Sequence, residues 1–148
     1  MQHKNIIITG ATDGIGLAAA KSIAKKGYHV SLVGRNPDKG KKALEAIIEY
    51  SGNENLDFFE CDLSLVANVK DLADRIKQKH SKIDVLLNNA GGANKTKQIT
   101  SEGLEKTFAT NQMNYFVLST ELLNILSESN DGRIAVSYTH LRAHETSL

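Results

Sequence analysis

The fold of this chain is decided by eight residues, Thr9-Gly10-Ala11-Thr12-Asp13-Gly14-Ile15-Gly16. They follow an apolar run, residues 6–8, and open an alanine-rich segment, residues 17–20. This succession predicts a buried parallel strand, a glycine turn and the N-terminus of a helix. Free backbone N–H groups and the positive end of the helix dipole would then point at one place, as a dinucleotide pyrophosphate site requires. A tight turn without a ligand is the alternative, but the flanking strand and helix favour nucleotide binding.

Each glycine of this turn is expected to have a different purpose. Gly10 lets the chain turn off the strand, Gly14 lets the backbone approach the pyrophosphate, and Gly16 lets the helix pack closely on the sheet. The candidate cofactor-binding residues of the turn are Gly10, Thr12, Asp13, Gly14, Ile15 and Gly16.

Length, charge and cysteine content limit the class of protein. The 148 residues fit one domain with a buried core. A formal net charge of +1 gives no argument for a nucleic-acid or membrane partner. The single cysteine, Cys61, cannot form an internal disulfide, and neither a leader nor an apolar run of about 20 residues is present. We therefore expect a cytoplasmic protein that has no membrane segment and binds no nucleic acid.

Apolar, strand-like runs alternate with amphipathic helical stretches along the chain. The expected strands are residues 5–9, 29–33, 57–61, 85–88 and 133–136, and the expected helices are residues 15–26, 38–50, 65–79 and 102–127. Such alternation implies right-handed crossovers and a parallel sheet covered by helices on both faces. The expected fold class is therefore α/β with a doubly wound parallel sheet. Ligands of such a sheet bind at the carboxyl ends of its strands.

Gly34-Arg35-Asn36-Pro37-Asp38 follow the second expected strand. A fold that prefers NAD usually places an acidic residue here to bind the ribose 2′-hydroxyl. Arg35 stands there instead, and its planar guanidinium suits the 2′-phosphate of NADP, which makes NAD the less favoured cofactor. An ordinary solvated arginine is the alternative. Asn36 is expected to cap the next helix, with Pro37 in its first position, and the Asn36 backbone would lie close to the cofactor.

Polar and small residues also follow the third and fourth expected strands. Asp62 could shape its loop or accept a hydrogen bond from an adenine amino group, and the residues alone leave both open. Ser64 is expected to cap the third helix. In the stretch Asn88-Asn89-Ala90-Gly91-Gly92, the asparagine side chains can satisfy loop backbone groups. The small residues beside them would let a ligand lie against the main chain.

Together these motifs resemble the short-chain dehydrogenase/reductase family. The resemblance rests on Thr9-Gly10-x-x-x-Gly14-x-Gly16, Asp62, Asn88-Asn89-Ala90-Gly91 and Asn111, which have the order and spacing of the family from about residue 4 to residue 135. It implies a Rossmann fold, here truncated after about the fifth strand. Residues 33–36 and 110–112 look most like the retinol-dehydrogenase-like branch, which prefers NADP and acts on lipophilic carbonyls and alcohols.

The resemblance implies roles for the matching residues. Residues 10–16 would cradle the pyrophosphate, and Arg35 would bind the 2′-phosphate. Asp62 and Leu63 would flank the adenine. The residues that would line the adenosine ribose are Asn89, Ala90 and Gly91.

Asn111 matches the asparagine that kinks the long fourth helix and holds a water of the proton relay in the family. A polar residue on a solvated helix face is the alternative. The apolar positions of this helix are expected to be core: Phe108, Phe116, Leu122, Leu123 and Leu126. In the family this helix commonly packs against a partner subunit, which implies a homo-oligomer.

The catalytic pattern of the family is incomplete in this chain. The family needs a tyrosine as general acid/base, a lysine four residues later that lowers the tyrosine pKa, and a serine about a dozen residues upstream. Counted from Gly132, the serine falls at Thr139, and the other two positions lie beyond Leu148. Tyr138 has Arg142 four residues on, but it comes too early, and arginine is a poor replacement for that lysine.

Residues 136–148 are expected to be a non-native tail after a cofactor-binding domain of residues 1–135. Residues 136–146 resemble the translation of a widely used transposase-based sequencing adapter. His140 and His144 therefore receive no metal-binding role.

We therefore expect the N-terminal part of an NADP(H)-dependent oxidoreductase that transfers hydride between nicotinamide and a small carbonyl or alcohol substrate. This chain by itself is expected to be inactive. Two alternatives remain open. One is a dinucleotide-binding module without chemistry, against which Asn111 argues. The other is a different doubly wound protein such as a methyltransferase. An acidic residue at position 35 would favour that alternative, and Arg35 does not.

Overall fold

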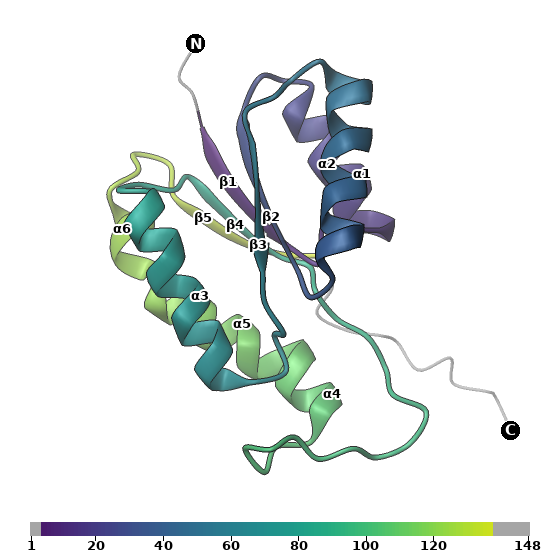
Figure 1. Cartoon of the computed structure of the whole chain (residues 1–148). Helices are drawn as coiled ribbons and strands as arrows, with labels where there is room; N and C mark the ends of the chain where they lie inside the picture. Colours follow the sequence, from purple (N-terminus) through teal and green to yellow (C-terminus); the bar gives the residue numbers. More distant parts are fainter. Residues whose placement is uncertain (1–3, 138–148) are drawn as a thin grey trace, which may run out of the picture.

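Five parallel strands form one sheet in the computed structural model, which describes residues 4–137 (Figure 1). The strand order is β3-β2-β1-β4-β5. The strands are β1 (Asn5–Thr9), β2 (His29–Gly34), β3 (Leu56–Glu60), β4 (Val85–Asn88) and β5 (Arg133–Val136). The order reverses beside β1, because β2 lies on one side of it and β4 on the other. The expected doubly wound parallel sheet is confirmed, and its switch point lies between β1 and β4.

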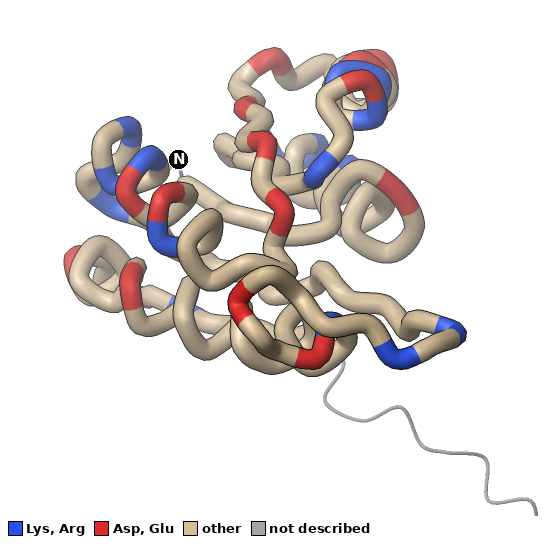
Figure 2. The backbone as a smooth tube through the Cα atoms, turned by 60° about the horizontal axis from the view of Figure 1, so that its bottom comes forward, with Lys and Arg blue, Asp and Glu red and all other residues tan. Residues whose placement is uncertain are grey.

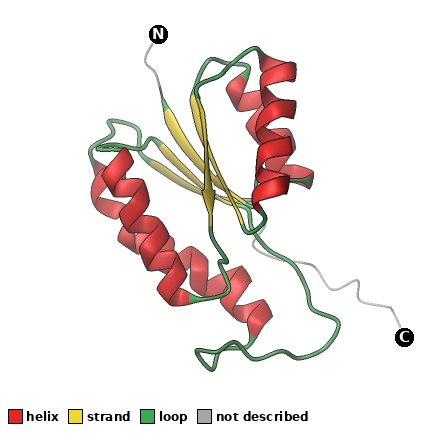
Figure 3. Cartoon of the chain, in the orientation of Figure 1, coloured by secondary structure: helices red, strands yellow, loops and turns green. Residues whose placement is uncertain are grey.

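Helices cover both faces of the sheet (Figure 3). They are α1 (Gly14–Ala24), α2 (Pro37–Ser51), α3 (Val66–Lys79), α4 (Lys106–Phe108), the π-helical segment η1 (Ala109–Met113), α5 (Asn114–Glu121) and α6 (Leu123–Ser127). Helices α1 and α2 lie on one face, and α3, α5 and α6 lie on the other (Figure 1). No helix within residues 4–137 is long and apolar enough to cross a membrane.

The single helix expected over residues 102–127 is wrong in two respects. Its first turn begins at Lys106, because the Glu105 carboxylate accepts hydrogen bonds from the backbone N–H groups of Thr107 and Phe108. Further on, η1 inserts a wider turn, and Leu122, with φ −94° and ψ 0°, separates α5 from α6. The hydrogen bonds from Leu122 to Leu118 and from Leu126 to Leu122 keep the two segments nearly continuous.

Two apolar clusters form the core, one on each face of the sheet. Ile6 and Ile8 pack under α1 and α2, whereas Ile7 packs under α3 and α5. Consecutive residues of β1 are therefore buried on opposite faces, as in a parallel sheet that helices cover on both sides.

The helix α5–α6 buries only one stripe of its surface. Leu118, Leu122 and Leu126 recur every four residues and face the core, so the two of them expected there, Leu122 and Leu126, are confirmed. Phe108, Phe116 and Leu123 were expected in the core as well, and this is wrong: they are exposed because they project from other sides of the helix.

The two helix caps expected from sequence have different outcomes. The Asn36 side chain accepts a hydrogen bond from the Lys39 N–H at 2.9 Å, with Pro37 in the first helical position, so this cap is confirmed. Ser64 does not cap α3. Glu102, distant in sequence, receives the first N–H groups of α3 on its carboxylate, at 2.6 Å from Val66 and 2.9 Å from Ala67. A charged group that binds these N–H groups from another segment is favourable beside the positive end of the helix dipole.

Charged residues of both signs are mixed along the helices (Figure 2). In α3, Arg75 pairs with Asp71 and Lys77 pairs with Asp74, one helical turn away in each case. Such exposed pairs each contribute only about 0.3–0.5 kcal/mol to stability. The fold therefore depends on its core and on a few buried polar contacts.

Asp84 is a buried carboxylate at the amino end of the sheet, directly before β4. Its carboxylate accepts hydrogen bonds from the Asn5 N–H at 2.8 Å and from the Ser129 hydroxyl at 2.6 Å. Burial alone would raise the pKa of Asp84. The hydrogen bonds from Ser129 and Asn5, with Lys82 and Lys4 nearby, outweigh burial and hold this pKa below its usual value.

Asp84→Asn is expected to lower the free energy of unfolding by about 2 kcal/mol at pH 7, because one hydrogen-bond donor of the amide would face another donor. The pKa of Asp84 is lower in the folded state than in the unfolded state. Its contribution to stability is therefore fully present at pH values above the usual carboxyl pKa of about 3.9, and it is lost as the pH falls through the lowered pKa of the folded state. Urea unfolding of the unsubstituted protein and of Asp84→Asn between pH 7 and pH 2 measures this contribution. The difference between their free energies of unfolding should become smaller at acidic pH. A constant difference would contradict the role of Asp84. Glu54→Gln, at an exposed carboxylate, is the control.

Candidate functional site

A groove of about 430 Å³ lies at the carboxyl ends of the strands. It is lined by the ends of β1 and β2, the loops after β3 and β4, and residues of α2, α4 and η1. Nine of the residues expected at the cofactor line it: Gly10, Thr12, Asp13, Arg35, Asn36, Asp62, Leu63, Ala90 and Gly91. The other candidate site residues do not line it: Gly14, Ile15, Gly16, Asn89 and Asn111. Sequence motifs that are far apart in the chain thus meet in one place.

The glycine turn packs directly against the loop after β4. Gly10 has φ +64°, in the left-handed region, and a Cβ atom on it would lie 2.7 Å from the Cα of Ala90. A Cβ on Gly16 would lie 2.2 Å from the Gly10 carbonyl oxygen and 2.5 Å from Nδ2 of Asn89. These contacts are closer than van der Waals packing allows, so the helix can approach the turn only with glycine at position 16.

Gly14 differs from the other two glycines of the turn. It has φ +52°, and a Cβ on it would meet nothing within 4 Å. Gly14 and Ile15 are both exposed at the first turn of α1, so the N-terminus of this helix is open to solvent. Approach of a pyrophosphate to this backbone stays a prediction.

Thr9 connects the turn to the loop after β4 and was not singled out as a site residue from the sequence. Its buried hydroxyl oxygen accepts hydrogen bonds from the N–H groups of Asn89 at 2.9 Å and Ala90 at 3.0 Å. The same hydroxyl donates to the Leu87 carbonyl at 3.4 Å. A small hydroxyl residue at the end of a buried strand, directly before a glycine turn, is the signal that could have found it.

The Asn89 side chain binds the backbone of the glycine turn. Its side-chain amide donates to the carbonyl oxygens of Thr9 and Gly10, at 3.1 Å each. The expectation that an asparagine here satisfies loop backbone groups is therefore confirmed. The next two residues, Ala90 and Gly91, line the groove, and contact of all three with a ribose stays a prediction.

Asp62 shapes its own loop. One carboxylate oxygen accepts hydrogen bonds from the Ser64 N–H at 3.0 Å and the Ser64 hydroxyl at 2.8 Å. Burial alone would raise the pKa of Asp62, but the Ser64 bonds, Lys106 and Arg35 together lower it, which keeps the group ionised at neutral pH. The second carboxylate oxygen makes no hydrogen bond within residues 4–137, so it can still accept one from a ligand.

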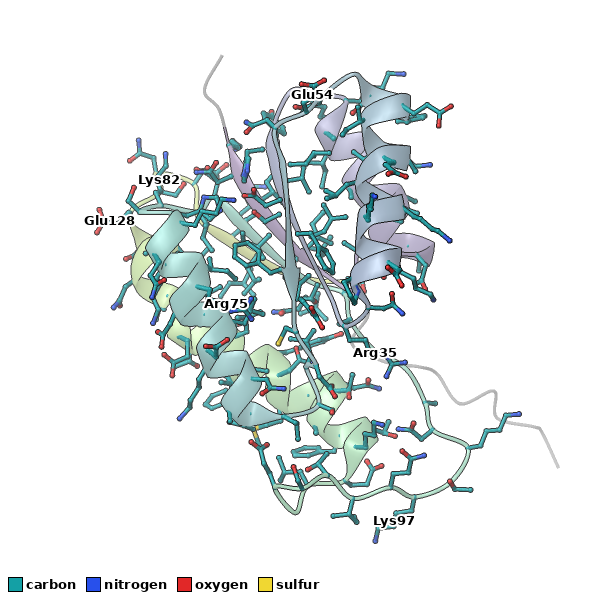
Figure 4. The ribbon with its side chains drawn as sticks, in the orientation of Figure 1. Arg35, Glu54, Arg75, Lys82, Lys97 and Glu128 are labelled. Atoms are coloured by element: carbon teal, nitrogen blue, oxygen red, sulfur yellow. The ribbon has the colours of Figure 1, made fainter. Side chains whose placement is uncertain are left out.

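Arg35 is a cationic residue at the carboxyl end of the sheet, near the start of the loop after β4 (Figure 4). It is exposed and makes no hydrogen bond or ion pair to any other residue of the described range 4–137. Lys39, which also lines the groove, binds Asp13 instead, with 3.3 Å between Nζ and Oδ2. The guanidinium of Arg35 can thus turn to an anionic ligand without breaking an ion pair, and so can Lys106, which lines the groove and within residues 4–137 binds only the Gln98 side chain.

Asn111 lies within the π-helical segment η1 and pairs with the loop after β4. Its Oδ1 accepts a hydrogen bond from the Gly92 N–H at 3.0 Å, and its Nδ2 donates to the Gly92 carbonyl at 2.9 Å. This two-point contact joins the half-buried Asn111 to the loop after β4, and the alternative of a solvated helix position stays open. The irregular helix around Asn111 agrees with the expected kink, while a role in proton transfer stays a prediction.

The expected tail lies mostly outside the described residues. Strand β5 runs through Val136, and the Ser137 N–H donates to the Asn88 carbonyl at 3.1 Å. The positions discussed for catalysis and metal binding that fall outside residues 4–137 are Tyr138, Thr139, His140, Arg142 and His144.

Comparison with known proteins adds the family. The family model of the short chain dehydrogenases matches residues 4–138. Bovine dehydrogenase/reductase SDR family member 12 is 41% identical over 128 residues, which are 86% of this chain and 40% of that protein. Human polyprenol dehydrogenase is 37% identical over 123 residues, 83% of this chain and 37% of that protein. The chain therefore spans about two fifths of the length of these relatives.

Solved structures agree with the fold. A short chain dehydrogenase from Shigella flexneri complexed with NADP has 30% sequence identity and a TM-score of 0.76, over 90% of this chain and 57% of its own. A metagenomic short-chain oxidoreductase in complex with NADP has 25% identity and a TM-score of 0.78, over 90% of this chain and 61% of its own. The fold, the groove and these similarities lead to one conclusion: the chain belongs to the short-chain dehydrogenase family of oxidoreductases.

Proposed function

We propose that this chain forms the cofactor-binding part of an NADP(H)-dependent oxidoreductase. The observation that carries the proposal is the groove at the carboxyl ends of the parallel strands, which is lined by Asp13, directly before α1, and by the unpaired Arg35 after β2. The solved relatives that contain NADP support the choice of cofactor.

The residues of the groove fit the parts of NADP in order. The glycine turn at residues 10–16 would hold the pyrophosphate, because no side chain covers the backbone at Gly14. Arg35 would bind the 2′-phosphate. The free carboxylate oxygen of Asp62 would accept a hydrogen bond from the adenine amino group, and Leu63 would lie against the adenine ring. Ala90 and Gly91 would lie against the adenosine ribose. The bound cofactor would supply or accept the hydride, and these residues would orient it.

The chain provides binding rather than turnover in this proposal. None of its four tyrosines has a lysine four residues later, because the residues at those positions are Leu32, Glu54, Ser119 and Arg142. Asn111 would hold the proton-relay water only together with such a tyrosine and lysine. We therefore propose that the 148-residue chain binds NADPH without reducing a carbonyl compound, and that the longer protein transfers hydride.

The nature of the substrate and the oligomeric state also belong to this proposal. A lipophilic carbonyl or alcohol is favoured by the similarity to polyprenol dehydrogenase. The exposed Phe116 and Leu123 on α5–α6 favour packing of this helix against a partner subunit. A cytoplasmic location stays a prediction, and one relative, from Brassica napus and 33% identical over 128 residues (86% of this chain, 40% of that protein), is named as chloroplastic.

A dinucleotide-binding module without chemistry is the second candidate, because the residues that line the groove are ones that bind a cofactor. The two candidates are distinguished by the activity of a longer protein that contains this domain. Reduction of a ketone by the longer protein with NADPH supports the oxidoreductase. Binding of NADPH without turnover by that longer protein supports the module.

Arg35→Glu is expected to weaken NADPH binding roughly 10- to 100-fold, because charge-assisted hydrogen bonds to the 2′-phosphate are each worth about 1.5–3 kcal/mol. The substitution should also strengthen NADH binding, since a carboxylate at this position can accept a hydrogen bond from the ribose 2′-hydroxyl. Fluorescence titration with both cofactors measures the ratio of the two dissociation constants. Lys25→Glu makes the same charge change at the far end of α1 and is the matched control. An unchanged preference for NADPH in Arg35→Glu would refute this role.

A further inference from the structure

A second cluster of chemically versatile side chains lies at the other end of the sheet from the groove. His29 is the first residue of β2, Asp57 is the second residue of β3, and His80 directly follows α3. In Figure 4, Glu54 and Lys82 mark this end of the sheet and Arg35 marks the opposite one. The proposed cofactor function uses none of these three residues.

The three side chains converge on one point. Nε2 of His29 lies 2.9 Å from Oδ2 of Asp57, and Nε2 of His80 lies 3.6 Å from the same oxygen. Donor atoms of the three residues all lie within 4.8 Å of one another. The ligand atoms of a tetrahedral zinc ion, with bonds of about 2.0–2.1 Å, are separated by about 3.4 Å. Small side-chain movements would therefore bring the three atoms to the spacing of zinc ligands.

Ser31 supplies a fourth polar atom at the same spacing. Its Oγ lies 3.4 Å from Oδ2 of Asp57 and 3.4 Å from Nε2 of His80. This hydroxyl has one proton to offer, so it cannot donate to both partners at once. Ser31 therefore places a fourth possible ligand atom beside Asp57 and His80, and at most one of its two contacts is a hydrogen bond that it donates.

The cluster is buried, which makes incomplete pairing costly. The side chains of His29, Asp57 and His80 are only 10%, 14% and 8% exposed. A cation that binds Asp57 and both imidazoles would give these desolvated groups a common partner.

We propose that His29, Asp57 and His80 form a binding site for a divalent transition-metal ion, zinc in the first place, with the Ser31 hydroxyl or a water as fourth ligand. Two imidazole nitrogens and one carboxylate oxygen are ligands that zinc prefers. Burial lowers the pKa of both histidines, so they are neutral at pH 7, as metal ligands must be.

Lys79 is the one cation that binds Asp57 among residues 4–137, and it uses the other carboxylate oxygen, Oδ1. The Lys79 side chain is half exposed, so it can turn into water when an ion binds at Oδ2. The ion would join the amino ends of β2 and β3 to the last turn of α3. Because β3 is the edge strand of the sheet, the site would stabilise the fold rather than take part in hydride transfer.

Calorimetric titration of the full chain with Zn²⁺ at pH 7.5 tests the proposal. The triple variant His3→Gln/His140→Gln/His144→Gln removes the other three histidines and serves as the background. We expect it to bind one Zn²⁺ per chain and to unfold at a higher temperature with the ion. In this background, His80→Gln and Asp57→Asn should each weaken binding by roughly 100-fold, since loss of even an outer-shell partner costs about 10- to 100-fold. Asp74→Asn, an exposed carboxylate of α3, is the matched control and should bind as the background does.

Titration with Co²⁺ provides a readout that needs no substitution at the cluster. Four-coordinate Co²⁺ absorbs strongly in the visible range, whereas hydrated, octahedral Co²⁺ absorbs weakly. An intense band that Zn²⁺ removes supports the site, even where a cluster variant fails to fold. The proposal is overturned if the background variant binds no Zn²⁺, or if His80→Gln and Asp57→Asn bind it as tightly as Asp74→Asn.

Discussion

Gly16→Ala is expected to lower the free energy of unfolding by about 3 kcal/mol, because overpacking of this kind typically costs about 1–3 kcal/mol and both atoms in its way are fixed. The new Cβ would lie 2.2 Å from the Gly10 carbonyl oxygen, which is backbone, and 2.5 Å from Nδ2 of Asn89, which is held by two hydrogen bonds. Without this contact, alanine in a helix would stabilise the protein by about 1 kcal/mol. The sign of the change therefore reports directly on the close packing of α1 against the turn.

Thermal or urea unfolding measures the effect of Gly16→Ala, and Gly14→Ala is its matched control. Gly14 also belongs to α1 but has open space around it, so its replacement costs only the strain of φ +52°, about 1–2 kcal/mol. We expect Gly16→Ala to be the less stable of the two and to lose NADPH binding with the geometry of the turn. A Gly16→Ala protein as stable as the natural one would contradict the packing described here.

Thr9→Val is expected to have the second largest effect, about 3 kcal/mol of lost stability, because each buried N–H left without an acceptor costs about 1–3 kcal/mol. Valine has nearly the shape of threonine but cannot accept the hydrogen bonds from the N–H groups of Asn89 and Ala90. These two residues begin the loop that forms one wall of the groove, so NADPH affinity should fall as well.

Thr9→Ser separates the hydroxyl of Thr9 from its methyl group. Serine keeps the acceptor and loses one methyl, which costs about 1 kcal/mol. Urea unfolding of the two variants should therefore place Thr9→Ser between the natural protein and Thr9→Val. Equal stability of the serine and valine variants would show that the hydroxyl does not hold the loop.

The sheet could be predicted closely from the sequence because its strands are local apolar runs between turn residues. The expected bounds of β1, β4 and β5 agree with the structure, those of β2 differ by one residue at one end, and β3 is shifted by one residue at both ends. The start of α2 was predictable for the same reason, since Asn36 and Pro37 act on residues next to them. Short-range signals of this kind are contained in a few adjacent residues.

Features that depend on distant segments could not be predicted in this way. Glu102 caps α3 from a position 36 residues away from Val66, so no local pattern indicates it. The π-helical segment η1 lies between Phe108 and the buried stripe of Leu118, Leu122 and Leu126, so the rotation between them does not follow the regular helical period. In the site, the sequence predicted which loops meet but not that Thr9 and Asn89 hold them together through one shared set of hydrogen bonds.

The central claim is that the groove at the carboxyl ends of β1, β2 and β4 binds NADP(H). Titration of the 148-residue chain with NADPH, followed by the fluorescence of the nicotinamide, tests it most directly, with NADH and S-adenosylmethionine as competitors. We predict saturable binding of one NADPH per chain, weaker binding of NADH and no displacement by S-adenosylmethionine. Binding of S-adenosylmethionine in preference to NADPH, or no saturable NADPH binding by a folded chain, would contradict the claim.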